Sequence, residues 1–399
     1  MANIQDYIEW RGDLSFEQTP FCNVDALILC QISYLNFDRL LPDYDFNYSQ
    51  KLSELAVVFE SAKDFKKRSE AGLLINKKTA PFFLSLAKCR RFENILATGY
   101  VSKIDLSIEE QFAAISYKLP DGTNFICFRG TDDSIVGWKE DFNLATEEEV
   151  PAQKDAVEYL EKASKSLKGK LRLGGHSKGG NLSMYASAVV DKKISDRILC
   201  IYNNDGPGFY EARVQSPEFL RIAEKVESFY PRFSIVGMLF QHIGKQTFVE
   251  SDEIGIMQHD PFSWHIMGNN FVVLANNDYG SKFFHNTFNE WISNLAPEKR
   301  GIFVDTVFKI IESTDAKTNT ELEENFARNS VKVLKTINKL DPEMRKVCRE
   351  TVIEFFKAGH SQLTKADTVI KQKLEESTKH TKNVLKKITG KIFRKKQEE

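Results

Sequence analysis

The chain has 399 residues, of which 42% are hydrophobic and 12% aromatic, so it is long and apolar enough for a large core and is not a disordered chain. Its 55 basic residues balance 56 acidic ones. The formal charge of −1 excludes the strongly basic field typical of nucleic-acid-binding proteins, and we expect no nucleic-acid partner.

The six cysteines are scattered, and no two of them have the CxxC spacing of a zinc or redox site. Cys127 and Cys200 lie in apolar runs, which predicts buried thiols in a reducing compartment. We therefore expect no metal site. Residues 1–20 show no basic segment followed by an apolar one, and no apolar run has the length of a membrane span, which predicts a cytoplasmic protein.

The pattern of the first third of the chain changes from helical to extended. Residues 24–40 place apolar side chains at helical spacing, and further helical patterns occur within 50–98. Residues 111–119 and 123–130 are extended segments joined by a Pro-Asp-Gly turn, which predicts a β-hairpin.

Helices and strands then alternate. Helices are predicted at 153–168, 181–190 and 217–226, and strands at 170–175, 196–205, 226–231 and 246–251. This alternation favours an α/β fold with a mostly parallel sheet flanked by helices on both faces. From about residue 296 the pattern is helical and charged, which predicts a helical C-terminal extension.

Gly175–His176–Ser177–Lys178–Gly179 matches the G-x-S-x-G motif and stands between a predicted strand and a predicted helix. In that context the serine lies on a strained turn, and the N-terminus of the following helix favours a developing oxyanion. A phosphate-binding loop is the alternative, but there the lysine precedes the hydroxyl residue, whereas Lys178 follows Ser177. Ser177 is therefore the predicted nucleophile.

A second motif, Phe-Arg-Gly-Thr-Asp at 128–132, ends the predicted hairpin. A turn there can offer the backbone N–H of Thr131 as one oxyanion donor, and the N–H of Lys178 is the expected second donor. A turn in which Arg129 forms a structural salt bridge is compatible with that role.

The string FRGT, followed by Trp138 and Asp141 and then by GHSKG, resembles the fungal-type class 3 lipases. The strings NNDGPGF, SIVGML and QHDPFSW are similar to a bacterial lipase-like branch of that group. The resemblance covers about residues 20–275. It implies an α/β-hydrolase fold and a serine hydrolase that acts on acyl esters without a cofactor.

A serine nucleophile needs a histidine base, and the histidine needs a carboxylate that fixes its tautomer. In hydrolases of this fold both follow the serine, the acid first. His259 follows the last predicted strand and matches the lipase pattern, so it is the predicted base. His242 is the first alternative base, and His265 is the second.

The acid departs from the lipase pattern, because Ser234 occupies the position of the expected aspartate. Asp205 ends the strand after the motif's helix, where a few lipases of this fold place their acid, and it is the predicted acid here. It also stands in an Asp-Gly-Pro-Gly sequence that forms turns by itself. Three carboxylates close to His259 in sequence remain alternatives: Asp252, Glu250 and Asp260.

Residues 379–396 contain eight Lys or Arg and no acidic residue, with apolar residues on one face at helical spacing. Such a helix can lie on an anionic membrane, although a solvated helix end or disordered tail has the same composition. We thus expect a hydrolase-like domain at 20–295, a helical cap or extension at 296–378 and a basic amphipathic tail at 379–399.

The predicted function is cleavage of acyl or lipid esters through an acyl-enzyme on Ser177, in the cytoplasm with peripheral contact at the inner membrane surface. One alternative is a catalytically impaired lipase-like module that binds lipid or a protein partner at the membrane surface, which Ser234 favours. Another is a thioesterase or peptidase with the same triad, because these enzymes share acyl-transfer chemistry.

Overall fold

The computed structural model describes residues 1–69, 76–105, 110–131, 149–231, 236–237, 239–253, 258–274 and 345. The chain divides into two compact units, 1–345 and 346–399, and all elements described below belong to the first. The predicted extension at 296–378, apart from residue 345, and the predicted tail at 379–399 lie outside the described residues.

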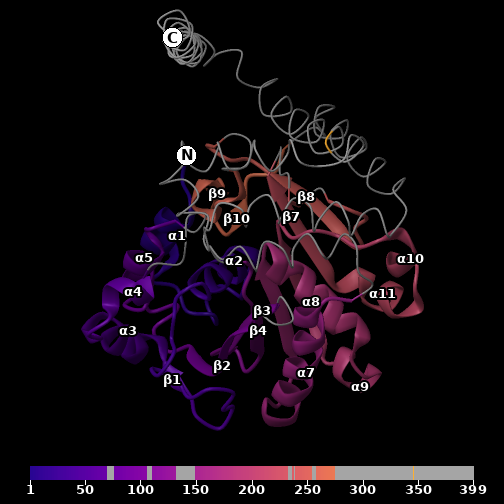
Figure 1. Cartoon of the computed structure of the whole chain (residues 1–399). Helices are drawn as coiled ribbons and strands as arrows, with labels where there is room; N and C mark the ends of the chain where they lie inside the picture. Colours follow the sequence, from indigo (N-terminus) through magenta and orange to yellow (C-terminus); the bar gives the residue numbers. More distant parts are fainter. Residues whose placement is uncertain are drawn as a thin grey trace, which may run out of the picture. The chain divides into compact units, whose positions relative to one another are not determined.

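Eight of the described strands form one mixed sheet in the order β1 to β8 (Figure 1). The strands are β1 (Gln50–Lys51), β2 (Leu96–Asp105), β3 (Glu110–Lys118), β4 (Asn124–Phe128), β5 (Leu171–His176), β6 (Ile198–Asn204), β7 (Val226–Pro231) and β8 (Lys245–Val249). Pairing is antiparallel from β1 to β4 and parallel from β4 to β8. Two further short strands, β9 (Ile266–Met267) and β10 (Asn270–Phe271), pair with each other.

Two described helices precede β1, three lie between β1 and β2, and the others lie between the successive parallel strands β4 to β7. The described helices are α1 (Ile4–Arg11), α2 (Asn23–Ile32), α3 (Leu52–Ser61), α4 (Phe65–Ser69), α5 (Thr79–Leu86), α7 (Pro151–Ser166), α8 (Lys178–Val189), α9 (Lys192–Ser195), α10 (Glu211–Val214) and α11 (Pro217–Ile222), with short 3-10 turns η1 (Ala223–Lys225) and η3 (Pro261–Ser263). In the described part of the chain, no helix is both long and apolar enough to cross a membrane.

The side chains of β4 show why both faces of the sheet are covered. Phe125 and Cys127 belong to one hydrophobic cluster, and Ile126 and Phe128 belong to the other, because successive side chains of a strand point to opposite faces. Helices α1, α2, α3 and α5 supply the first cluster, whereas α7, α8 and α11 supply the second. The chain therefore has the predicted α/β-hydrolase fold, with a mostly parallel sheet between helical layers.

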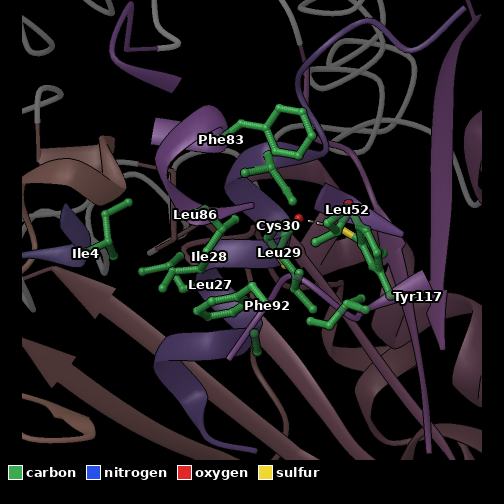
Figure 2. Packing of buried hydrophobic residues seen from close by; sticks show 14 of the residues in the cluster. Ile4, Leu27, Ile28, Leu29, Cys30, Leu52, Phe83, Leu86, Phe92 and Tyr117 are labelled. Atoms are coloured by element: carbon green, nitrogen blue, oxygen red, sulfur yellow. Dashed lines mark hydrogen bonds between the residues drawn. The ribbon is translucent and has the colours of Figure 1, made fainter. Parts of the chain in front are cut away.

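Helix α2 lies at the centre of the first cluster. Residues 27–30 have no exposed surface, and Figure 2 shows them packed beside Phe83 and Leu86 of α5 and beside Phe92. Full burial of a leucine or isoleucine side chain contributes about 1.5–3 kcal/mol. The same cluster includes Ile4 of α1, so the packing begins before residue 20, the predicted start of the domain.

Two sequence predictions differ from the structure. The helical pattern over 24–40 forms a helix only as far as Ile32, and the last described helix within 50–98, α5, ends at Leu86. The sequence analysis did not predict β2, which is the longest described strand. A register shift between Thr98 and Val101 breaks its alternation, and Gly99 there has a φ of 62°. Such a bulge hides the two-residue period on which strand prediction depends.

Candidate active site

Ser177 lies between β5 and α8 with φ 58° and ψ −134°, a strained conformation for a residue with a side chain. The flanking glycines permit the sharp turn. A Cβ on Gly175 would lie 2.1 Å from the carbonyl carbon of Gly179, and one on Gly179 would lie 2.0 Å from the Phe128 oxygen. The predicted strand–turn–helix around the serine is therefore confirmed. Its two glycines are needed because a side chain at either position would clash with the backbone.

The strand register brings Asp205 next to this turn. In the parallel pair β5–β6, His176 stands opposite Asn204, and the Ser177 N–H donates to the Asn204 carbonyl over 2.9 Å. Ser177 and Asp205 are thus the first residues after two adjacent strands, at the edge where α/β folds place their ligand sites. Asp205 also has a positive φ, 56°, and is fully buried.

Asp205 is hydrogen-bonded to His259. The His259 Nδ1–H donates to Asp205 Oδ2 over 2.7 Å, and the His259 side chain is 13% exposed. A carboxylate at Nδ1 fixes the tautomer and leaves Nε2 to exchange a proton. The structure thus brings together the predicted acid and the predicted base, which are 54 residues apart in sequence.

His259 lies against the residue that precedes the serine. Its ring centroid is 4.4 Å from that of His176, and the His176 Nε2–H donates to the His259 carbonyl over 2.8 Å. Because His176 directly precedes Ser177, these contacts place His259 at the turn that carries Ser177.

Asparagines support the Asp205 turn, and the sequence analysis did not single them out. The Asn203 Oδ1 accepts the Gly206 N–H over 2.9 Å, and the Asn181 Nδ2 of α8 donates to the carbonyl of Gly208 over 3.0 Å. Both asparagines are fully buried. Fully buried amides need hydrogen-bond partners. An asparagine within the otherwise apolar pattern of a strand or a helix is therefore the sequence signal that could have identified these two residues.

The first predicted oxyanion donor lies on the adjacent loop. A Cβ on Gly130 would be 3.0 Å from the Ser177 Cβ, so the chain leaving β4 passes directly beside Ser177. Thr131 is the next residue and is 8% exposed. Residues 132–148, which include Trp138 and Asp141, lie outside the described residues.

The second predicted donor, Lys178, is the first residue of α8, so its N–H lies at a helix N-terminus directly after the serine. Its ammonium group is directed elsewhere, because Nζ donates to the carbonyl of Gln111 in β3 over 2.9 Å. The side chain thus links the turn at Ser177 to β3.

The alternative bases and acids have other partners. His242 Nδ1 bonds the Tyr230 hydroxyl over 2.8 Å. His265 bonds Glu250 through Nδ1 at 3.3 Å and Asp252 through Nε2 at 2.7 Å, so these two carboxylates serve His265 and not His259. His242 is thus bonded to Tyr230 and His265 to both carboxylates, whereas the Asp205 carboxylate bonds His259.

Asp260 follows His259 in sequence, but its carboxylate accepts hydrogen bonds from Asn76 and from the backbone of the next turn. Its Oδ2 accepts from the Asn76 amide over 2.7 Å, and its Oδ1 accepts the Phe262 N–H over 3.0 Å. Burial raises the pKa of the Asp260 carboxyl above its ordinary value. Ser234, at the lipase position of the acid, lies outside the described residues. No group of His, Cys, Asp and Glu side chains in the described ranges is arranged to hold a metal ion.

Comparison with solved structures finds lipases at low similarity. The M37 lipase is 14% identical with a TM-score of 0.30 and covers 54% of this chain and 69% of its own. A Rhizomucor miehei lipase–propeptide complex is 13% identical, with a TM-score of 0.29 and coverage of 52% and 73%. A deletion mutant of that complex is 15% identical, with a TM-score of 0.31 and coverage of 57% and 81%. The fold assignment follows instead from the strand order and helical layers.

No curated protein matches the chain. A protein-family model described as Mbeg1-like matches residues 86–309, a range that contains Ser177, Asp205 and His259. This match covers more than half of the chain, which therefore belongs to the Mbeg1-like family, a lipase-like family.

Proposed function

We propose that the protein is a serine hydrolase that cleaves carboxylic esters of acyl chains or lipids through an acyl-enzyme on Ser177. The observation that carries this proposal is the 2.7 Å bond between buried Asp205 and His259, at the edge where the strained Ser177 turn lies. The lipase-like family supports the same chemistry.

In the proposed reaction, the Ser177 oxygen attacks the ester carbonyl carbon while His259 Nε2 takes the hydroxyl proton. Asp205 stabilises the resulting imidazolium. The N–H groups of Thr131 and Lys178 bind the negative oxygen of the tetrahedral intermediate, and each such donor contributes about 3 kcal/mol. The intermediate collapses, His259 protonates the leaving alkoxide, and an alcohol departs.

Water then completes the proposed cycle. His259 removes a proton from a water molecule as its oxygen attacks the acyl carbon bound to Ser177. When the second intermediate collapses, His259 returns the proton to the serine oxygen and the carboxylic acid leaves. The net reaction consumes one ester and one water and produces one alcohol and one acid.

Fluorophosphonate labelling of the full chain tests the nucleophile. We expect labelling of the wild type and none of Ser177→Ala, with Ser187→Ala as the matched control because Ser187 is a buried serine of α8, the helix that follows Ser177. Absence of labelling in a folded wild type would contradict the hydrolase and favour an impaired lipase-like module. Rates on matched p-nitrophenyl esters, thioesters and anilides would then separate an esterase from a thioesterase or peptidase.

We also propose a cytoplasmic location with reversible contact between residues 379–396 and anionic membranes. The eight basic residues of this segment, which lies outside the described residues, support the proposal. Full-length protein should sediment with phosphatidylglycerol vesicles and not with phosphatidylcholine vesicles, and added salt should reverse the binding. Replacement of Lys386 and Lys387 by glutamate should reduce binding, and unchanged binding would contradict the proposal.

A further inference from the structure

Both ring nitrogens of His176 form hydrogen bonds. Nδ1 lies 2.9 Å from the Tyr34 hydroxyl, and Nε2 lies 2.8 Å from the carbonyl oxygen of His259. A carbonyl can only accept, so Nε2 carries a proton. In the neutral ring Nδ1 must then accept, and the Tyr34 hydroxyl donates to it. The contacts therefore select one neutral tautomer.

The surroundings keep this ring neutral. His176 is 2% exposed. Burial lowers the pKa of the His176 imidazole well below its ordinary value, and the neighbouring His259 lowers it further. A neutral His176 with both nitrogens engaged cannot take the Ser177 proton, although it is adjacent to the serine in sequence. Of these two neighbouring imidazoles, only His259 has a nitrogen left for that proton.

We propose that His176 is a positioning residue that holds His259 in place for proton transfer by donating Nε2–H to the His259 carbonyl. This inference rests on the proposed function. The Asp205 carboxylate fixes the far nitrogen of the His259 ring, and His176 fixes the backbone of the same residue and packs against the ring face. Two anchors on one residue restrict both its position and its rotation.

The neutral state of His176 is part of this role. During the reaction His259 carries a positive charge, and a second cation with its ring centroid 4.4 Å away would oppose that charge. A neutral ring at the same place lets His259 accept the proton. The Tyr34 hydroxyl, which is 142 residues away in sequence, favours the tautomer whose proton is on Nε2.

Two amide substitutions of His176 test its Nε2 donor and its Nδ1 acceptor separately. In His176→Gln, the amide nitrogen can take the place of Nε2 and still donate to the His259 carbonyl. In His176→Asn, the shorter amide can still accept from Tyr34 but does not reach that carbonyl. We expect kcat on a soluble p-nitrophenyl ester to fall about 100-fold in His176→Asn and less than about fivefold in His176→Gln, with KM unchanged in both.

A purely structural role would instead reduce folded protein in both variants and leave kcat per folded, labelled site unchanged. Thermal unfolding measures the folded fraction, and fluorophosphonate titration counts the active sites, so that kcat can be expressed per folded, labelled site. Equal kcat in His176→Asn and wild type would overturn the inference, as would equal losses in the two variants.

A readout without catalysis separates this inference from the proposed function. In protein labelled with 15N-histidine, the Nδ1 proton of His259 bonded to Asp205 should give a downfield resonance that Asp205→Asn abolishes. We expect that resonance to persist in His176→Gln and to broaden in His176→Asn as the ring loses its anchor. If the wild type takes no fluorophosphonate but the resonance follows residue 176, the hydrolase proposal fails and the positioning role stands. If the resonance is identical in all residue-176 variants, the positioning role fails.

Discussion

Two fully buried aspartates, Asp25 in α2 and Asp205 after β6, have opposite surroundings. Both oxygens of Asp25 are satisfied: Oδ1 accepts from Tyr7 and Arg91 over 3.0 and 2.7 Å, and Oδ2 accepts from Arg91 and the Cys22 N–H over 2.6 and 2.8 Å. Asp205 Oδ2 bonds His259, whereas its Oδ1 has no hydrogen-bond partner among the described residues.

The partners explain the difference. The Arg91 guanidinium is permanently charged and also donates to backbone carbonyls such as those of Thr19 and Pro20, so the Asp25–Arg91 pair links α2 to the preceding loop. The partner of Asp205 is an imidazole, a group that can exchange a proton, whereas a guanidinium cannot. A buried carboxylate saturated by a fixed charge is structural, whereas one bonded to an imidazole can serve proton transfer.

Asp205→Asn should have the largest effect on activity. An amide in place of the carboxylate no longer holds the Nδ1–H tautomer or stabilises the imidazolium, and the corresponding change in a serine protease triad lowers kcat about 10⁴-fold. Ester kinetics and thermal unfolding of the same preparation would measure it. We expect little change in the melting temperature, and nearly full activity of the variant would remove Asp205 from the proposed triad.

Arg91→Met should have a larger effect on stability than Asp205→Asn. It leaves the Asp25 carboxylate buried without its charge partner, which destabilises proteins by about 3–5 kcal/mol. Urea unfolding would measure the loss, while kcat per folded molecule should stay within about twofold of wild type. Because an apolar pair removes the unpaired charge, Asp25→Leu combined with Arg91→Met should recover part of the stability. A double variant no more stable than Arg91→Met would contradict this.

Local patterns predicted the central part of this comparison. The glycine-flanked Ser177 and the Asp-Gly-Pro-Gly turn after a strand are contiguous signals, and parallel strands bring such turns to one edge of a sheet. The site's supports were not predictable in this way. Tyr34 and His176 are 142 residues apart, and only the folded sheet brings them together. The strand β2 was missed for a local reason, the bulge at Gly99.

Glu110 is a third buried carboxyl and sharpens the comparison through its pH dependence. Burial raises its pKa to about 7, with Lys103 opposing the rise and Asp155 adding to it. Between about pH 4.5 and 7, native Glu110 thus retains a proton that the unfolded chain has lost. Its contribution to stability is therefore present at low pH and is lost as pH rises through this window.

Glu110→Gln should remove this dependence, which amounts to about 3 kcal/mol for a pKa change of this size. Urea unfolding of both proteins at pH 5, 6, 7 and 8 would measure the difference. The lowered pKa of His176 gives wild type the opposite slope, since only the unfolded imidazole takes up a proton as pH falls below 6.5. That slope is common to both proteins and cancels in their difference. A difference that stays constant with pH would contradict the raised pKa.

Asp252→Asn should have the smallest effect, and it isolates the contribution of burial. Asp252 bonds His265 at 2.7 Å, the same distance as the Asp205–His259 bond, but its side chain is 53% exposed. Since water screens an exposed pair, we expect a stability change below about 1 kcal/mol and an unchanged kcat/KM. A loss of activity approaching that of Asp205→Asn would contradict this. It would mean that the exposed Asp252–His265 pair matters for activity as much as the buried Asp205–His259 pair beside Ser177.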